Sequence, residues 1–296
     1  MARGLAPRVR EVLDDAEGSI DRFLSTMMGE SFDDRLSRLD LRLGGGGVDA
    51  FGLDPQWAKY GLFASAVLYR HYFRCEVTGL EHVPQGRVLF ISNHSGQIPL
   101  DAAMIGTALF LEAEPPRLVR SMIEKWTQTL PFVSTFFSRV GQVVGVPENA
   151  RRLLELEEAL LVFPEGAAGI AKTYDRAYQL TDFGLGFMRL ALETQTPIVP
   201  ISVVGAEEQY VSVGNLTGLA KILGVPALPV IPQLFFPGGQ LPLPTKYRIA
   251  FGAPLRFEGT SDDDDDQTIE AHVWTVRTTI QQMLNEALAK RKGVFF

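Results

Sequence analysis

Short apolar runs alternate with helical patterns through the middle of the chain. Apolar runs of about four to eight residues, bounded by turn residues, are typical of strands buried in a sheet. A strand and turn are predicted over 76–84, and further strands at 87–92, 141–146, 159–163, 198–204 and 246–251. Helices are predicted at 57–73, 101–111, 148–158 and 185–193. This alternation predicts an α/β fold with a mixed, largely parallel sheet flanked by helices.

Both ends of the chain show amphipathic helical patterns. A last helix is predicted over 269–292. Gly44–Gly47 interrupt any regular element, so we predict a helical segment and glycine linker over 1–47 and the main domain over 48–296. The N-terminal helix would dock on the domain, on a membrane or on a second copy. Its apolar face is formed by residues at helical spacing: Ile20, Phe23, Leu24, Met27 and Met28.

The stretch Ile222–Thr245 has no charged residue, but its six prolines exclude a membrane-spanning helix. Two interpretations stay open: a loop packed over the core or an apolar cavity, and a loop that dips into a membrane surface. The first residues become charged too early for a secretory signal, so we expect a cytoplasmic protein.

The composition is that of a folded domain, with 46% hydrophobic and 21% charged residues. Because 28 Lys and Arg stand against 35 Asp and Glu, the net charge of −7 argues against a nucleic-acid partner. Cys75 is the only cysteine, which excludes an intrachain disulfide. The four histidines and this cysteine lack metal-ligand spacing, so we predict no metal. Asp262–Asp266 lack the spacing of a calcium loop and are interpreted as a solvated loop.

The segment Ser92–Asp101 contains the most informative chemistry. His94 follows an apolar strand in an Asn-His-Ser-Gly turn, and Asp101 comes seven residues later. An imidazole can take a proton from a hydroxyl when a carboxylate holds its other nitrogen. His94 and Asp101 are therefore a candidate catalytic pair, although a lone histidine is more often structural than catalytic.

A second polar turn follows the strand that ends at Phe163. Glu165, between Pro164 and Gly166, can accept hydrogen bonds from substrate hydroxyls or steady a neighbouring cation. Farther along, Lys172 and Arg176 are four residues apart, so they would share a face if that segment is helical. On a shared face they could bind one phosphate together. The alternative is that they are two solvated surface charges.

The order of four motifs resembles the glycerolipid acyltransferase family, which includes lysophosphatidic acid acyltransferases. The motifs are NHSGQIPLD, GQVVGV, VFPEG and TPIVPISVVG. The resemblance implies a glycerol-3-phosphate acyltransferase-like fold with His94 and Asp101 as the catalytic pair. It also implies that Phe163–Gly166 help to bind the acceptor and that Ile198–Pro200 support the site.

Residues beside the catalytic histidine are expected to contact the substrate: Asn93, Ser95 and Gly96. Backbone amides near Ser95 and Gly96, or near Gly166, are candidate donors to the oxyanion of the tetrahedral intermediate. Six residues separate His94 from Asp101, where the family has four. The pair meets only if Ser95–Leu100 bulge outward.

Two arginines associated with the acceptor phosphate in the family are absent. Ala167 and Ala168 follow the FPEG block in place of Thr-Arg, and Pro147 stands where the second motif usually ends in arginine. A phosphate dianion needs fixed cationic donors, so lysophosphatidic acid is disfavoured unless another cation substitutes. The cations that could do so are Lys172, Arg176 and Arg151. Otherwise the acceptor is a diacylglycerol, a long-chain alcohol or a lysophospholipid with a larger head group.

The resemblance implies an O-acyltransferase that transfers a fatty acyl group from acyl-CoA, or from an acyl carrier protein, to a lysophospholipid or other glycerolipid. No cofactor is implied beyond that co-substrate. We expect the protein to act peripherally at the inner face of a membrane. Two rival hypotheses are a serine hydrolase, which the lack of a G-x-S-x-G motif disfavours, and a non-catalytic lipid-binding protein on a degenerate acyltransferase scaffold.

Overall fold

The computed structural model describes residues 30–94, 99–225, 227–259 and 266–296. The chain divides into two compact units, Met1–Asp40 and Leu41–Phe296. The described part of the first unit contains helix α2 (Glu30–Ser37). The helix predicted at Ile20–Met28 and most of the aspartate run lie outside the described residues. The second unit contains the sheet and the candidate site.

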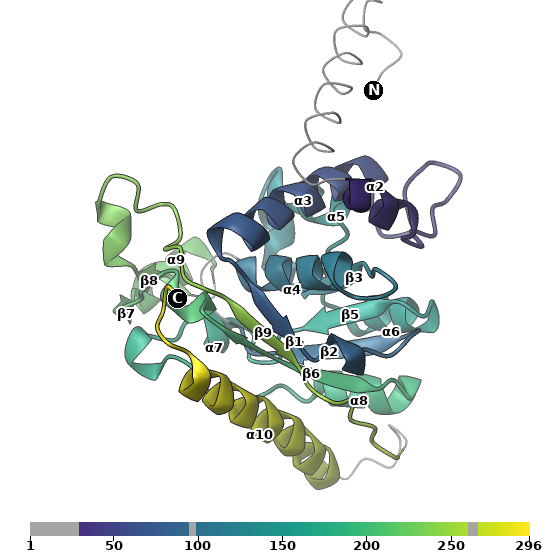
Figure 1. Cartoon of the computed structure of the whole chain (residues 1–296). Coiled ribbons are helices and arrows are strands. Elements are labelled where there is room, and N and C mark those ends of the chain that lie inside the picture. The colour runs from purple at the N-terminus through teal and green to yellow at the C-terminus, as the bar shows by residue number, and fades with distance from the viewer. Residues whose placement is uncertain (1–29, 95–98, 226, 260–265) are drawn as a thin grey trace, which may run out of the picture. The chain divides into compact units, whose positions relative to one another are not determined.

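A seven-stranded sheet forms the centre of this unit (Figure 1). Its strand order is β1-β9-β6-β2-β5-β3-β4, and every neighbouring pair is parallel except β6 and β9. The prediction of a mixed, largely parallel sheet is therefore confirmed. The strands are β1 (Glu76–Thr78), β2 (Val88–Ser92), β3 (Val119–Ile123), β4 (Val143–Val144), β5 (Ala159–Val162), β6 (Ile198–Val204) and β9 (Arg248–Phe251).

Helices cover both faces of the sheet (Figure 1). One face is covered by α3 (Pro55–Val67), α4 (Leu100–Leu111) and α5 (Val133–Arg139). Against the other pack α6 (Pro147–Glu155), α8 (Gly186–Thr194) and α10 (Asp266–Lys290). The central strands are buried on both faces, as the continuous burial of β2 and β6 shows. This burial explains why these strands read as continuous apolar runs in the sequence.

Shorter elements complete the unit. They are the π-helix η2 (Leu68–Tyr72), the short helix α7 (Ala167–Ile170), helix α9 (Thr217–Leu223) and the strand pair β7 (Gly214–Asn215) and β8 (Pro229–Val230). The 3-10 helices are η3 (Leu80–His82), η4 (Lys125–Thr129), η5 (Tyr174–Arg176), η6 (Ala206–Glu208) and η7 (Pro232–Phe235). Within the described part of the chain, no helix has the length and apolar character needed to cross a membrane.

The sequence analysis missed strand β3, which lies between β5 and β4. Its sequence VRSMI contains an arginine and a serine, so it does not show the apolar run of a buried strand. Arg120 is nevertheless only 1% exposed, and its guanidinium pairs with Asp49 at 2.7 Å. The strand predicted at 141–146 is also shorter than expected, since only Val143 and Val144 pair.

The strand order determines where reactive groups can meet. Strands β2, β5 and β6 run parallel, so their carboxyl ends lie at the same edge of the sheet. Ser92, Val162 and Val204 are their last residues. The loops that follow them therefore converge, and crevices at this edge are where open α/β sheets bind ligands.

Candidate active site

His94 and Asp101 lie within hydrogen-bond distance. The Nδ1 atom of His94 is 2.8 Å from Oδ2 of Asp101. The Asp101 side chain is fully buried in the first turn of α4, and its Oδ1 accepts the Ala102 N–H at 2.8 Å. A carboxylate only accepts, so Nδ1 of His94 carries the proton and Nε2 is left with a lone pair. The imidazole is thus oriented to accept a proton at Nε2.

Glu165, in the turn after β5, joins three segments through its buried carboxylate. Its Oε1 accepts the His94 backbone N–H at 3.1 Å. Its Oε2 accepts the backbone N–H and the hydroxyl of Thr181 at 2.8 and 3.0 Å. Lys172 lies 3.5 Å from the same oxygen. Glu165 therefore fixes the backbone of the histidine rather than its ring.

Close packing also positions the histidine ring. Phe163 stacks on the imidazole with ring centroids 4.2 Å apart and an interplanar angle of 28°. Gly169, in α7, lies so close that a Cβ atom there would be 2.9 Å from Cβ of Glu165 and 3.2 Å from Cβ of His94. Only glycine fits this contact without displacing a neighbour.

Asn93 is fully buried and extends the pairing of β2 with β6 beyond the end of the strand. Its side-chain amide donates to the Val203 carbonyl at 3.0 Å, and its Oδ1 accepts the Val203 N–H at 2.8 Å. Both ends of the amide are engaged with the backbone. The structure therefore places this predicted substrate contact in a supporting position, where it fixes the chain just before His94.

The charges around His94 alter its acidity. Burial lowers the pKa of the imidazole, but the charge and hydrogen bond of Asp101 and the charge of Glu165 raise it, with a net pKa above the ordinary 6.5. The positive charge of Lys172 opposes this rise. A raised pKa makes the neutral imidazole a stronger base, provided the ambient pH keeps it unprotonated.

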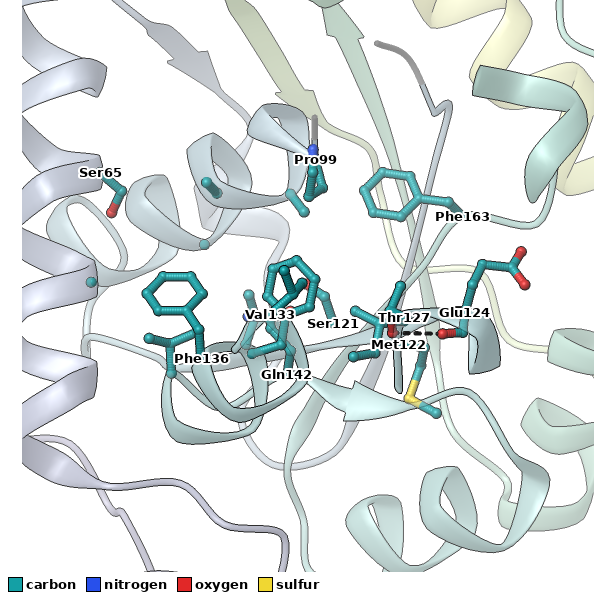
Figure 2. Close-up of a pocket in the computed structure, with 18 of the residues that line it drawn as sticks. Ser65, Pro99, Ser121, Met122, Glu124, Thr127, Val133, Phe136, Gln142 and Phe163 are labelled. Atoms are coloured by element: carbon teal, nitrogen blue, oxygen red, sulfur yellow. Dashed lines mark hydrogen bonds between the residues drawn. The ribbon is translucent and has the colours of Figure 1, made fainter. Parts of the chain in front are cut away.

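An apolar cavity of about 570 Å³ opens beside the histidine. His94, Phe163 and Gly166 contribute to its wall, and the rest comes mainly from α3, α4, β3, η4 and α5. In Figure 2, Phe163 and Glu124 lie toward one end and Ser65 and Phe136 toward the other. Its volume is in the range of about 300–1,000 Å³ that is usual for small-molecule sites.

Comparisons with known proteins identify the family. The profile of the Acyltransferase family matches residues 74–204. An uncharacterised protein of Mycobacterium leprae is 38% identical over 263 residues, which are 84% of this chain and 70% of the relative. A protein of Mycoplasma pneumoniae named as a probable 1-acyl-sn-glycerol-3-phosphate acyltransferase is 25% identical over 51% of this chain and 57% of its own length. The chain belongs to the glycerolipid acyltransferase family.

A solved acyltransferase has the same fold. The crystal structure of the 1-acyl-sn-glycerophosphate acyltransferase PlsC from Thermotoga maritima matches with a TM-score of 0.51 and 16% identity, covering 94% of this chain and 90% of that one. The matched family segment, 74–204, contains both His94 and Glu165. Asp101 lies in the same segment, so the family profile covers the candidate catalytic pair and Glu165.

The two predicted phosphate-binding cations occupy different positions. Helix α7 ends at Ile170, and Arg176 belongs to the separate 3-10 helix η5, so the two do not share one helical face as the prediction required. The Lys172 side chain is only 5% exposed and lies 2.9 Å from Glu207. Arg176 is exposed. Arg151 pairs instead with Glu193 at 2.6 Å.

The other predicted substrate contacts lie in the loop after β2 and in the turn after β5. Ser95 and Gly96 lie outside the described residues. The Gly166 N–H donates to the Phe163 carbonyl at 3.0 Å, so this candidate oxyanion donor is already paired in a turn. The Pro164 carbonyl accepts the Gly184 N–H at 3.0 Å. Pro164 thus supports the turn through its backbone.

The sequence analysis missed Glu207 and Thr181, which complete the carboxylate cluster. Glu207 follows β6 just as Glu165 follows β5, so a search for acidic residues after every strand of the shared edge would have found it. Its Oε2 accepts the Tyr178 N–H at 2.8 Å. Burial raises the pKa of Glu207, while Lys172 lowers it. No local signal in the sequence marks Thr181, which comes from an irregular segment.

Proposed function

We propose that this protein is an O-acyltransferase that moves a fatty acyl group from a thioester, acyl-CoA or acyl carrier protein, to a hydroxyl of a glycerolipid. The observation that carries the proposal is the 2.8 Å contact between His94 and buried Asp101 beside an apolar cavity. The histidine supplies the base, and the cavity supplies an environment for a hydrocarbon chain.

The reaction needs no covalent enzyme intermediate. Nε2 of His94 takes the proton from the acceptor hydroxyl as its oxygen attacks the thioester carbonyl. Asp101 stays ionised and stabilises the imidazolium that forms. When the tetrahedral intermediate collapses, the carbon–sulfur bond breaks and the departing thiolate takes the proton from His94. The products are an ester and a free thiol, and the enzyme returns to its starting state.

The charges near His94 favour an acceptor without a phosphate monoester. Lys172, the cation that acts on His94, lies between the carboxylates of Glu165 and Glu207 and is nearly inaccessible. A phosphate at this place would compete with two carboxylates for one ammonium group and would be repelled by both. We therefore propose a neutral glycerolipid acceptor, such as a mono- or diacylglycerol, in preference to lysophosphatidic acid.

The test is an acyl-transfer assay with radiolabelled donor. Acyl-CoA and acyl carrier protein thioesters are each offered with monoacylglycerol, diacylglycerol, lysophosphatidic acid, other lysophospholipids and long-chain alcohols. We expect ester formation with a neutral glycerolipid, and its loss on His94→Ala. His71→Ala is a matched control, because this exposed histidine lies outside the site.

Three outcomes would contradict parts of the proposal. Absence of product with every pair of substrates would favour a lipid-binding protein without catalysis. Product that persists in His94→Ala would exclude the histidine as the base. A preference for lysophosphatidic acid over the neutral acceptors would overturn the acceptor assignment and leave the reaction type intact.

A further inference from the structure

Most of the connection between β6 and β9 carries almost no charge. Over residues 210–245, here called the apolar segment, Lys221 is the only charged residue. Nine of the eighteen large apolar side chains exposed in the described chain belong to this segment. They are Val213, Leu216, Leu219, Ile222, Leu234, Phe235, Phe236, Leu241 and Leu243. Such a concentration of exposed apolar side chains marks an interaction surface.

The exposure does not come from a loosely held loop. The Gln233 side chain accepts the Val211 N–H at 3.4 Å and donates to the Gln209 carbonyl at 3.2 Å. Tyr210 donates to the Gln240 carbonyl at 2.7 Å, and Tyr72 to the Pro242 carbonyl at 2.5 Å. These contacts fix both ends of the turn that presents Phe235 and Phe236, which are 82% and 66% exposed.

The backbone of the segment satisfies many of its own hydrogen bonds. The N–H groups of Phe236, Gly239 and Leu241 donate to carbonyls within the same turn, at 3.0–3.1 Å. Strands β7 and β8 pair with each other, and the Leu216 N–H donates to the Leu228 carbonyl at 2.8 Å. Internal pairing of this kind is what a segment needs to enter a lipid environment, where water cannot replace a lost partner.

The segment leaves the sheet at the edge that carries the site. It follows β6, whose carboxyl end lies beside that of β2. Asn215 donates to the Ala171 carbonyl at 2.6 Å, and the Tyr174 N–H donates to the Ser212 carbonyl at 2.8 Å. These bonds join the segment to the chain just after Glu165 and α7. A membrane contact here would bring the active site to its lipid substrates.

Cations lie near the base of the segment. One guanidinium nitrogen of Arg74 donates to the carbonyls of Pro244 and Phe295 at 2.8 and 3.1 Å, which ties the C-terminal tail to the end of the segment. The tail follows Lys290 and Lys292, which are exposed. Figure 1 shows the C-terminus at the side that carries β7, β8 and α9. Apolar side chains next to lysines match the interface of an anionic bilayer.

We infer that the apolar segment docks the protein on an anionic phospholipid bilayer, with Phe235 and Phe236 inserted among the acyl chains. The orientation argument rests on the proposed function, because it assumes substrates that reside in a membrane. The surface itself is defined by its exposed apolar side chains, by a single charged residue over 210–245 and by internal backbone pairing. A lipid surface fits it better than a protein partner, because the exposed side chains offer almost no polar groups for specific hydrogen bonds.

Flotation of the full chain with vesicles of phosphatidylcholine and phosphatidylglycerol tests this inference. We expect wild type to float and the double substitution Phe235→Glu/Phe236→Glu to lower the vesicle partition coefficient by about tenfold or more, since burying two charges in an apolar interface is unfavourable. The control is Trp274→Glu, which also replaces an exposed aromatic side chain by a carboxylate, at a position that is 63% exposed. Trp274 lies sixteen residues before Lys290 on α10, about 24 Å along the helix. Unchanged circular dichroism and unfolding temperature would show that each variant is folded.

The outcomes separate this inference from the proposed reaction. Equal flotation of wild type and the double variant, or no flotation of wild type, would overturn the docking surface whatever the acyl-transfer assay shows. A wild type that is dimeric without vesicles and becomes monomeric on the double substitution would assign the surface to self-association instead. If only the double variant fails to float and wild type shows no acyl transfer, the docking surface is supported and the proposed reaction is contradicted.

Discussion

The imidazole of His94 is held by a carboxylate at Nδ1, a phenyl ring on its face and a second carboxylate at its backbone. Of these, only Asp101 both orients the ring and changes its charge balance. Burial lowers the pKa of His94 and Asp101 raises it. A single substitution at Asp101 should therefore change this pKa measurably.

Asp101→Asn is predicted to lower the pKa of His94, because the negative charge that favours the imidazolium is lost. Acyl transfer should fall by roughly 10³–10⁴-fold, since the amide no longer enforces the tautomer with a free Nε2. In wild type, kcat/KM should rise with pH as His94 loses its proton, with a midpoint above 6.5. NMR titration of the histidine ring resonances measures the shift, with His94→Ala used for assignment. A midpoint that stays the same or rises in Asp101→Asn would refute the assigned role of Asp101.

Gly169→Ala is predicted to damage catalysis more than folding. The added methyl group would push on Glu165 and His94, whose Cβ atoms are 2.9 and 3.2 Å from its position. A displacement of this size at a catalytic base costs about 10–100-fold in rate. The comparison is with Gly186→Ala in α8, where no atom lies within 4 Å of the new methyl group. Equal activities of the two variants would show that the close packing at Gly169 is dispensable.

The local sequence was enough to predict the residues around His94, but not the partners that come from more distant segments. His94 and Asp101 belong to one short motif, and Glu165 lies in the turn after a recognisable strand, so their proximity follows from the convergence of parallel strands. Glu207 requires knowledge that β6 neighbours β2. The position of Lys172 between two carboxylates depends on the end of α7 at Ile170, which helical spacing alone did not predict.

At the scale of single elements, β3 shows why a strand can escape sequence analysis. Arg120 interrupts its apolar pattern, yet the side chain is buried because its Nε and Nη1 atoms find three partners: the Gly141 carbonyl at 2.7 Å, Asp49 at 2.7 Å and Glu158 at 3.1 Å. Such pairing depends on residues distant in sequence. The other central strands are aliphatic and need no distant partner to be buried. They were therefore predicted near their observed bounds.

Arg120→Met is predicted to destabilise the fold by about 3–5 kcal/mol, because it leaves the carboxylate of Asp49 buried without its cation. Burial already raises the pKa of Glu158, and loss of Arg120 should raise it further. The free energy of unfolding is measured by urea denaturation. Arg151→Met, which breaks an exposed pair with Glu193, serves as the control and should leave stability nearly unchanged. Similar stabilities of the two variants would mean that the buried ion pair contributes little.

At the scale of the whole unit, the sheet separates two environments. The face with α6, α8 and α10 carries the main cluster of buried apolar side chains, whereas the face with α3, α4 and α5 contains the cavity. Sequence periodicity predicted helices on the sheet but did not distinguish these faces, because a cavity wall and a core are both lined by apolar residues. The reversed direction of β9 against β6 was likewise not predicted, since the proline-rich connection between them carries no clear helical pattern.

The cavity leads to a prediction about acyl-chain length. Leu62 on α3 lines it one helical turn from Ser65, which lies toward the end away from Phe163 (Figure 2). Leu62→Trp should shorten the space for a hydrocarbon chain, so kcat/KM for the longest donors should fall by about tenfold while short donors react as before. Assays with acyl-CoA thioesters of increasing length measure the preference. The control is Ala64→Trp, because Ala64 lies on the same helix but is exposed and outside the cavity wall. Uniform loss of activity at every chain length would place the acyl group elsewhere.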